Sequence, residues 1–277
     1  MDTTLDKLNG NWAAGRFVCL GLDPQIGSIP QAVQKHSPAE TIIAFNRAII
    51  EVTSDLVAAY KPNVAFYERY GAEGHRALEV TIRCIRDHNP KAVIIVDAKR
   101  ADIGNTNSGY VDALFDLLGA DATTLNPYLG EDALSPFLER EDKFSFILCR
   151  TSNRGAGEFQ DLDVNGERLF EHVARRVADV WNKRNNLGLV IGATSPRELS
   201  DLRERVPRLP LLIPGVGAQG GDVDEVIRSV RAGGPPNVLI NSSRAILYAD
   251  NSAEFATRAR QVAMELGSSL AEGLSDG

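Results

Sequence analysis

The sequence alternates eight times between a short apolar run and a stretch in which apolar residues recur at helical spacing. Short runs rich in β-branched residues are typical of strands buried on both faces, and strands that alternate with helices form parallel sheets. The expected strands are residues 17–22, 60–66, 93–96, 121–125, 144–149, 187–191, 211–213 and 238–240. Eight strand–helix units in 277 residues favour an α/β fold with a single (β/α)8 TIM barrel over an open doubly wound sheet.

Start and stop signals place the longer helices between these strands. Ser37-Pro38-Ala39-Glu40 combines the serine, first-turn proline and early glutamate of a helix start. The expected helices include residues 37–57, 72–88, 166–184 and 253–266. No shift in composition marks a domain boundary. We therefore expect one domain over residues 1–277, with a short N-terminal extension and a frayed Gly/Ser-rich tail after Leu266.

Composition limits which binding partners and which cellular compartment are expected. Thirty basic against 37 acidic residues give a net charge of −7, which argues against nucleic acid as a general partner. Cys19, Cys84 and Cys149 are widely spaced within apolar stretches, which is typical of reduced core residues and not of a disulfide framework or zinc site. No run approaches the ~20 apolar residues of a membrane span, and the N-terminus lacks the pattern of a signal peptide. We expect a cytoplasmic protein that binds neither membrane nor metal.

Charged residues gather where the third strand ends. Val93 to Val96 runs into Asp97, Lys99 and Asp102, and Asp97 and Lys99 project to the same side because side chains alternate along a strand. The pattern does not fix the direction of Asp102, which follows the strand. Other strands also end in polar residues, namely Asp23, Lys61, Ser152 and Arg244. In a barrel these ends converge on one mouth, where active sites lie. The alternative is a structural ion pair that caps a strand.

A glycine-rich segment follows the seventh strand. Gly215-Val216-Gly217-Ala218-Gln219-Gly220-Gly221 comes after it, and Ser242-Ser243-Arg244 comes after the eighth. These two loops form the usual phosphate site of the barrel, where glycines let the backbone approach an anion. Arg244 can bind phosphate through two hydrogen bonds and Gln219 can donate from its amide. The alternative is a surface turn beside a solvated arginine.

Taken together, these residues resemble the orotidine 5′-phosphate decarboxylase family, and the length is similar to its longer bacterial branch. The resemblance rests on Asp97-Ala-Lys99-Arg-Ala-Asp102-Ile103, Lys61-Pro-Asn-Val-Ala-Phe66, Asp23, Arg150-Thr-Ser152-Asn and Asn241-Ser-Ser-Arg244. It implies a lyase of pyrimidine synthesis that converts a small nucleotide, orotidine 5′-phosphate, to UMP and CO2 without a cofactor.

The resemblance also implies a role for each site residue. Lys99 would donate a proton to C6 of the pyrimidine, flanked by Asp97 and Asp102, with Lys61 completing an alternating charged array. Asp23 would bind the ribose hydroxyls, Ser152 the pyrimidine edge, and Gln219 and Arg244 the phosphate. The family forms a homodimer, in which Asp102 and Thr106 are expected to reach the partner's site.

Three other functions remain open on the sequence. Sugar-phosphate decarboxylases and aldolases of the same barrel group use a similar Asp-x-Lys-x-x-Asp with Mg²⁺, but Lys61 would compete with a metal for the space beside the carboxylates. A Schiff-base aldolase needs a neutral amine, whereas neighbouring acids favour the charged form of Lys99. The third is a barrel that binds a phosphate ligand without catalysis.

Overall fold

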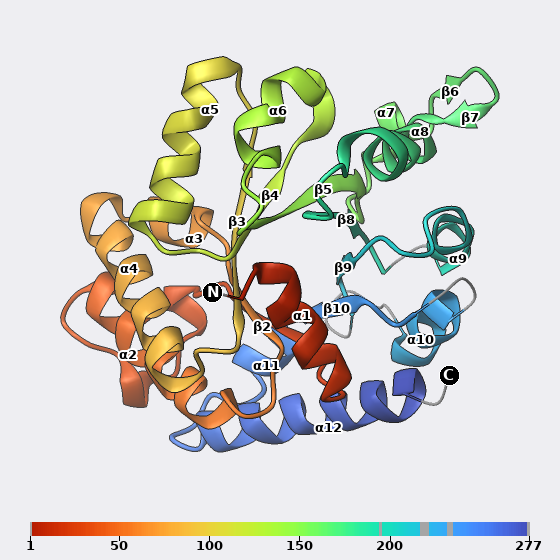
Figure 1. The fold of residues 1–277 in the computed structure, drawn as a ribbon. Coiled ribbons are helices and arrows are strands. Elements are labelled where there is room, and N and C mark those ends of the chain that lie inside the picture. The colour runs from red at the N-terminus through yellow and green to blue at the C-terminus, as the bar shows by residue number, and fades with distance from the viewer. Residues whose placement is uncertain (1, 194–195, 217–221, 232–234, 276–277) are drawn as a thin grey trace.

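The computed structural model describes residues 2–193, 196–216, 222–231 and 235–275, and it contains a closed barrel of parallel strands (Figure 1). Around the barrel the strands follow the order β1-β10-β9-β8-β5-β4-β3-β2. They are β1 (Val18–Leu22), β2 (Ala59–Pro62), β3 (Val93–Arg100), β4 (Ala122–Leu125), β5 (Phe144–Arg150), β8 (Leu187–Ile191), β9 (Leu211–Pro214) and β10 (Val238–Ser242). All eight expected strands are present, so the predicted (β/α)8 barrel is confirmed.

Helices form the outer ring, as Figure 1 shows. The main ones are α2 (Pro38–Thr53), α4 (Gly71–His88), α5 (Gly104–Val111), α6 (Gly130–Leu138), α8 (Leu169–Arg176), α9 (Pro196–Arg205), α10 (Val223–Arg231) and α12 (Phe255–Ser275). Ser37 caps α2 by accepting a hydrogen bond from the backbone N–H of Glu40, as the start signal predicted. The helix expected over residues 166–184 is shorter, because α8 ends at Arg176 and a π-helical turn, η5 (Val177–Trp181), follows.

Short elements lie in the loops that connect these units. They are α3 (Ala65–Glu68), α7 (Gly157–Gln160), α11 (Arg244–Leu247), the hairpin of β6 (Asp163–Val164) and β7 (Glu167–Arg168), the π-helical η3 (Asp112–Leu117), and the 3-10 turns η1 (Ile26–Ser28), η2 (Gln31–Val33) and η4 (Pro127–Leu129). No helix in the described part of the chain is both long enough and apolar enough to cross a membrane.

Two apolar clusters hold the barrel together. The larger lies between the strands and the surrounding helices. The smaller fills the barrel interior, with residues such as Cys19, Ile95, Phe146 and Leu239 pointing inward. Because side chains alternate along a strand, the interior positions lie two residues apart. Lys61 and Asp97 therefore follow Ala59 and Ile95 along the same inward face, at the mouth of the barrel.

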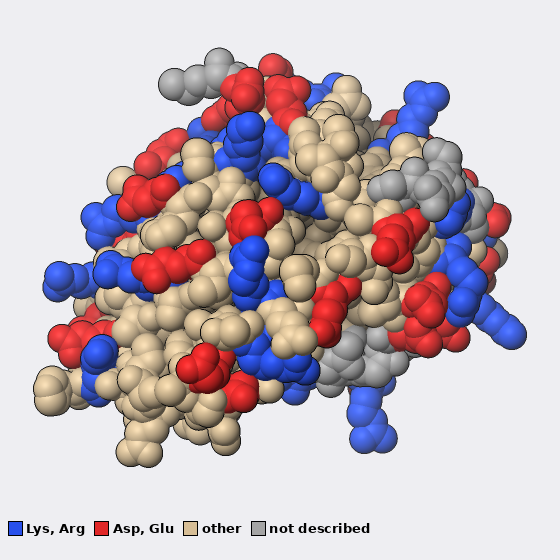
Figure 2. Space-filling view, turned by 90° about the horizontal axis from the view of Figure 1, so that it is seen from below, with Lys and Arg blue, Asp and Glu red and all other residues tan. Residues whose placement is uncertain are grey.

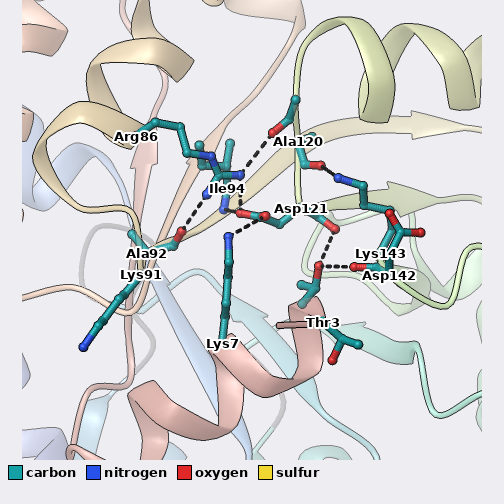
Figure 3. A network of polar contacts seen from close by, with 12 residues as sticks. Thr3, Lys7, Arg86, Lys91, Ala92, Ile94, Ala120, Asp121, Asp142 and Lys143 are labelled. Carbon is teal, nitrogen blue, oxygen red and sulfur yellow. Dashed lines mark hydrogen bonds and ion pairs between the residues drawn. The ribbon is translucent and has the colours of Figure 1, made fainter. Parts of the chain in front are cut away.

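The expected N-terminal extension is a helix, α1 (Thr4–Ala13), that closes the floor of the barrel. Leu8 is fully buried against the interior cluster, and the Trp12 indole donates to the carbonyl of Val238 at 2.8 Å. Asp121 is the centre of the polar contacts here: it pairs with Lys7 at 2.9 Å and Arg86 at 2.6 Å, and accepts from the N–H of Ile94 at 2.9 Å (Figure 3).

The C-terminal tail corrects a prediction. We expected the chain to fray after Leu266, but α12 continues to Ser275. Leu270 and Leu274 are buried, so the apolar face of the helix outweighs the helix-weakening effect of the glycines and serines in this segment.

The outer surface mixes charges of both signs. Figure 2 shows acidic and basic side chains interspersed across the face that it presents. Mixed charge on this face accords with the modest net charge of −7.

Candidate active site

A cavity of about 420 Å³ opens at the carboxyl ends of the strands. Its walls come from the carboxyl ends of six strands and from the loops that follow those strands. They comprise Asp23, Gln25, Lys61, Asn63, Phe66, Asp97, Lys99, Ser152, Pro214, Gly215, Val216, Asn241, Ser243 and Arg244. Six of the predicted site residues therefore share one cavity: Asp23, Lys61, Asp97, Lys99, Ser152 and Arg244.

Asp97 lies between two lysines at the base of this cavity. Its Oδ2 accepts from Lys61 Nζ at 2.9 Å and its Oδ1 accepts from Lys99 Nζ at 2.6 Å. Lys61 and Asp97 are buried, whereas the side chain of Lys99 is 48% exposed. The more accessible ammonium is therefore that of Lys99, which is the one able to meet a ligand.

Burial and charge act against each other in this array. Burial alone would raise the pKa of Asp97, but the charges of Lys61 and Lys99 outweigh it and hold that pKa well below its usual range. Burial alone would lower the pKa of Lys61, but the carboxylates of Asp97 and Asp23 outweigh it and hold that pKa above its usual range. Asp97 and Lys61 are therefore both ionised at neutral pH.

The end of the cavity that is expected to bind phosphate is partly within the described residues. Arg244 begins α11, and Ser243, Gly215 and Val216 line the cavity beside it. Gly21 makes room here, because a Cβ at that position would lie 1.8 Å from Ser243 Oγ. Gln219, the other residue predicted to bind phosphate, lies outside the described residues.

Asp102 and Thr106 do not line this cavity. The Oδ1 atom of Asp102 accepts from the N–H of Ile103 at 2.7 Å, and Thr106 is exposed in the first turn of α5. The structure thus gathers Lys61, Asp97 and Lys99 but leaves Asp102 apart. The expected place of Asp102 and Thr106 in a partner's site stays a prediction.

Two buried polar residues at the mouth were given no role on the basis of the sequence. Asn241 is 7% exposed and lines the cavity, and its Oδ1 has no hydrogen-bond partner among the described residues. Thr124, on β4, is 2% exposed and contacts both Asp97 and Lys99. Each is a polar residue in the carboxyl-terminal half of a buried barrel strand, which is the sequence signal that could have identified it.

Over residues 2–193, 196–216, 222–231 and 235–275, no group of three or more His, Cys, Asp or Glu side chains is arranged to hold a metal ion. Both carboxylate oxygens of Asp97 are instead occupied by ammonium groups.

Comparison with known proteins gives one consistent result. Residues 16–259 match the profile of the orotidine 5′-phosphate decarboxylase / HUMPS family. The chain is 51% identical to orotidine 5′-phosphate decarboxylase of Herpetosiphon aurantiacus over 89% of each sequence, and 48% identical to that of Roseiflexus castenholzii over 92% of each. Its fold is similar to that of Leishmania donovani OMP decarboxylase, with a TM-score of 0.82 and 35% identity over 98% of this chain and 99% of that one.

Proposed function

The chain belongs to the orotidine 5′-phosphate decarboxylase / HUMPS family, and from that membership we propose how its cavity performs the decarboxylation. The chain is a lyase that converts orotidine 5′-phosphate to UMP and CO2 in pyrimidine biosynthesis. The roles of individual residues are our proposal, and the observation that supports them most is the Lys61–Asp97–Lys99 array at the barrel mouth.

Lys99 stabilises the intermediate and supplies the proton. When CO2 leaves C6, the electron pair of the broken bond stays on that carbon, and the ring has no adjacent carbonyl that could delocalise it well. An ammonium fixed beside C6 opposes this charge, and such preorganised electrostatics is usually the largest catalytic effect. The Lys99 ammonium then transfers a proton to C6, which yields UMP and a neutral amine that regains its proton from solvent.

Asp97 and Lys61 support that step. Asp97 fixes the Lys99 ammonium by accepting its hydrogen bond at 2.6 Å, and Lys61 neutralises the second oxygen of Asp97. Asp97 would also repel the substrate carboxylate, by ~4 kcal/mol at 4 Å for an effective dielectric near 20 before solvation and countercharges are considered. Lys61 and Lys99 supply such countercharges, so we rank stabilisation by Lys99 above repulsion by Asp97.

The remaining cavity residues bind the substrate. Asp23 accepts hydrogen bonds from the ribose hydroxyls, with Lys61 nearby, and its Oδ1 is buried without a hydrogen-bond partner among the described residues. Ser152 contacts the pyrimidine edge. Arg244 holds the phosphate in a two-pronged contact, with Gln219 as the expected second donor.

The occupied carboxylate also bears on the rival metal-dependent chemistry. A Mg²⁺ ion needs free carboxylate oxygens, whereas both oxygens of Asp97 accept from lysines. This arrangement favours decarboxylation that needs neither a metal nor another cofactor.

A homodimer would complete the site. Ile103, which lies between Asp102 and Thr106 in the sequence, is 64% exposed, and Tyr128 is 87% exposed. Exposed apolar side chains of this size are available to a protein interface. A second copy packed against these side chains would bury them and carry Asp102 and Thr106 to the partner's cavity.

The three cysteines are free and buried, which supports a cytoplasmic, reducing location.

The direct test follows the loss of absorbance of orotidine 5′-phosphate, with and without EDTA, in the parent protein and in Lys99→Ala. We expect turnover that EDTA does not change, and a loss on the order of 10²–10⁴-fold or more in Lys99→Ala, because both an electrostatic and a proton-donating group are removed.

The matched control is Lys91→Ala, which removes an exposed lysine before β3 and should leave turnover unchanged. Activity that disappears with EDTA and returns with Mg²⁺ would support the metal-dependent rival. Activity that survives in Lys99→Ala would contradict the role proposed for Lys99.

A further inference from the structure

The side chain of Thr124 joins two parts of the charged array. Its hydroxyl accepts from the backbone N–H of Lys99 at 2.9 Å and donates to Asp97 Oδ1 at 2.8 Å. A hydroxyl has one proton and two lone pairs, so it can fill both roles at once. The same Oδ1 also accepts from Lys99 Nζ. Thr124 therefore ties the backbone of Lys99 to the carboxylate oxygen that holds its ammonium.

The backbone of Lys99 is in an uncommon conformation. Its φ is +46°, in the left-handed region, where Gly and Asn are the usual residues. The other described non-glycine residues with positive φ are both asparagines, Asn165 and Asn185. Strained backbone of this kind persists only where its surroundings hold it, and it concentrates at functional sites.

The strand ladder does not hold Lys99 in place. The register between β3 and β4 shifts between Val96 and Arg100, so Lys99 lies inside an irregular stretch of the pairing. Its N–H is bonded to the hydroxyl of Thr124, a side chain of the neighbouring strand, instead of to a carbonyl of the ladder. Thr124 replaces the missing ladder bond at the residue whose side chain enters the cavity.

We propose that Thr124 is a positioning residue for the decarboxylation, because its hydroxyl fixes both the left-handed backbone of Lys99 and the Asp97 oxygen that receives the Lys99 ammonium. This inference rests on the proposed role of Lys99. Thr124 acts through Lys99 and Asp97 and transfers no proton to the substrate. Losing the hydroxyl leaves the charges present and the substrate contacts intact, but it releases the geometry that places the ammonium at C6.

The neighbouring residue offers a matched control. Thr123 is also a fully buried threonine of β4, and its hydroxyl donates to the carbonyl of Val96 in β3 at 2.8 Å. It therefore makes one buried hydrogen bond to the same strand, but none to a charged residue of the site. Thr123→Val and Thr124→Val remove comparable buried hydroxyls, so both should lower thermal stability.

The experiment measures kcat, KM, UMP affinity and Tm for Thr124→Val, Thr124→Ser and Thr123→Val. We expect kcat to fall by about 10- to 100-fold in Thr124→Val, because small misplacements of a catalytic group have effects of this size. KM and UMP affinity should stay within about threefold, since the binding contacts remain. Thr124→Ser should recover kcat to within about threefold of the parent, and Thr123→Val should change kcat by less than about twofold.

The inference is overturned if Thr124→Val keeps parental kcat, if it changes KM alone, or if Thr123→Val loses kcat equally. If Thr124→Val does not fold, Thr124→Ala and Thr124→Ser decide the question, because they differ only by the hydroxyl and equal kcat values would contradict the proposal. The Lys99→Ala variant separates the role proposed for Lys99 from the role proposed for Thr124. An active Lys99→Ala refutes the role proposed for Lys99, whereas an inactive Lys99→Ala beside a fully active Thr124→Val refutes only the role of Thr124.

Discussion

Asp97 is the residue on which the charges of the site depend. Its two oxygens receive three hydrogen bonds, from Lys61, Lys99 and Thr124. Because the two ammonium groups hold the pKa of this carboxyl low despite its burial, Asp97 stays ionised throughout the neutral pH range. A single carboxylate thus keeps two like charges close together at the mouth of an apolar barrel.

The shifted pKa values predict how this array stabilises the fold as pH changes. The pKa of Asp97 is lowered from 3.8, so its contribution is complete above that value and is lost as pH falls toward the lower folded-state pKa. The pKa of Lys61 is raised from 10.5, so its contribution is complete below that value and is lost as pH rises toward the higher folded-state pKa.

Asp97→Asn tests the predicted loss of stability at acidic pH. At pH 7 it should lower the free energy of unfolding by about 3 kcal/mol, because Lys61 loses its buried partner. The difference from the parent should shrink as pH falls through 3.8, where half of the unfolded parent has taken up a proton at this carboxyl. Urea denaturation at pH 7, 5, 4 and 3 measures it. A difference that stays constant over this range would contradict the assigned pKa shift.

Some site residues could be predicted from the sequence, and others could not. Asp23, Lys61, Asp97 and Lys99 come at the ends of recognisable strands, and strand ends of a barrel must converge. The place of Asp102 could not be predicted, because the loop after β3 has no periodicity to fix its direction. The role of Thr124 depends on the left-handed backbone of Lys99, which no residue pattern announces.

At the scale of the elements, α1 stands out because it closes the end of the barrel opposite the cavity. Its contacts are with residues at or just before the amino ends of strands, such as Asp121 and Val238. The residues that we propose to be catalytic are at the carboxyl ends. Residues of the floor should therefore govern stability with little effect on turnover.

Asp121→Asn tests that separation. It removes the ion pairs with Lys7 and Arg86, while an amide oxygen can still accept from the N–H of Ile94. We expect the free energy of unfolding to fall by about 3 kcal/mol, because two cations lose the buried carboxylate that they share. Kcat and KM should remain within about twofold.

The control for this variant is Asp116→Asn. Asp116 is 51% exposed and pairs with Arg140, and exposed pairs of this kind contribute less than about 1 kcal/mol. Equal losses of stability in the two variants, or a large loss of kcat in Asp121→Asn, would refute the division between floor and mouth.

The two ends of the chain show what element prediction missed and why. The start of α1 carries a capping box between Thr3 and Asp6, which is visible in the sequence, but a ten-residue helix gives too short a window for a clear period. In α12, Leu266, Leu270 and Leu274 recur every four residues. The glycines and serines between them indicated fraying, but Leu270 and Leu274 are buried and Leu266 packs partly buried against the core, which decides the outcome.

At the scale of the whole molecule, the proposed dimer distributes each site over two chains. Ile103 and Tyr128 are exposed in one chain, and Ile103 is next to Asp102 in the sequence. If the partner supplies Asp102, a chain that lacks Lys99 and a chain that lacks Asp102 can together form one intact site.

Mixing Lys99→Ala with Asp102→Ala tests this arrangement. Each variant alone should be nearly inactive. After subunit exchange at equal concentrations, half of the dimers are mixed and each mixed dimer has one intact site, so activity should rise to about a quarter of the parental value. Sedimentation gives the oligomeric state in parallel. A mixture no more active than its components would contradict a shared site.

The position of α1 also has a consequence for how the protein is made. Thr4 donates a hydrogen bond to the carbonyl of Asp121, and Trp12 donates one to the carbonyl of Val238. These partners follow them in the sequence by 117 and 226 positions. A ten-residue helix is barely stable by itself in water, so α1 can dock completely only after those distant residues have been synthesised. A nascent chain that stops before Val238 leaves Trp12 without its acceptor, and translation of the last strand becomes the event that lets the earliest-made helix dock.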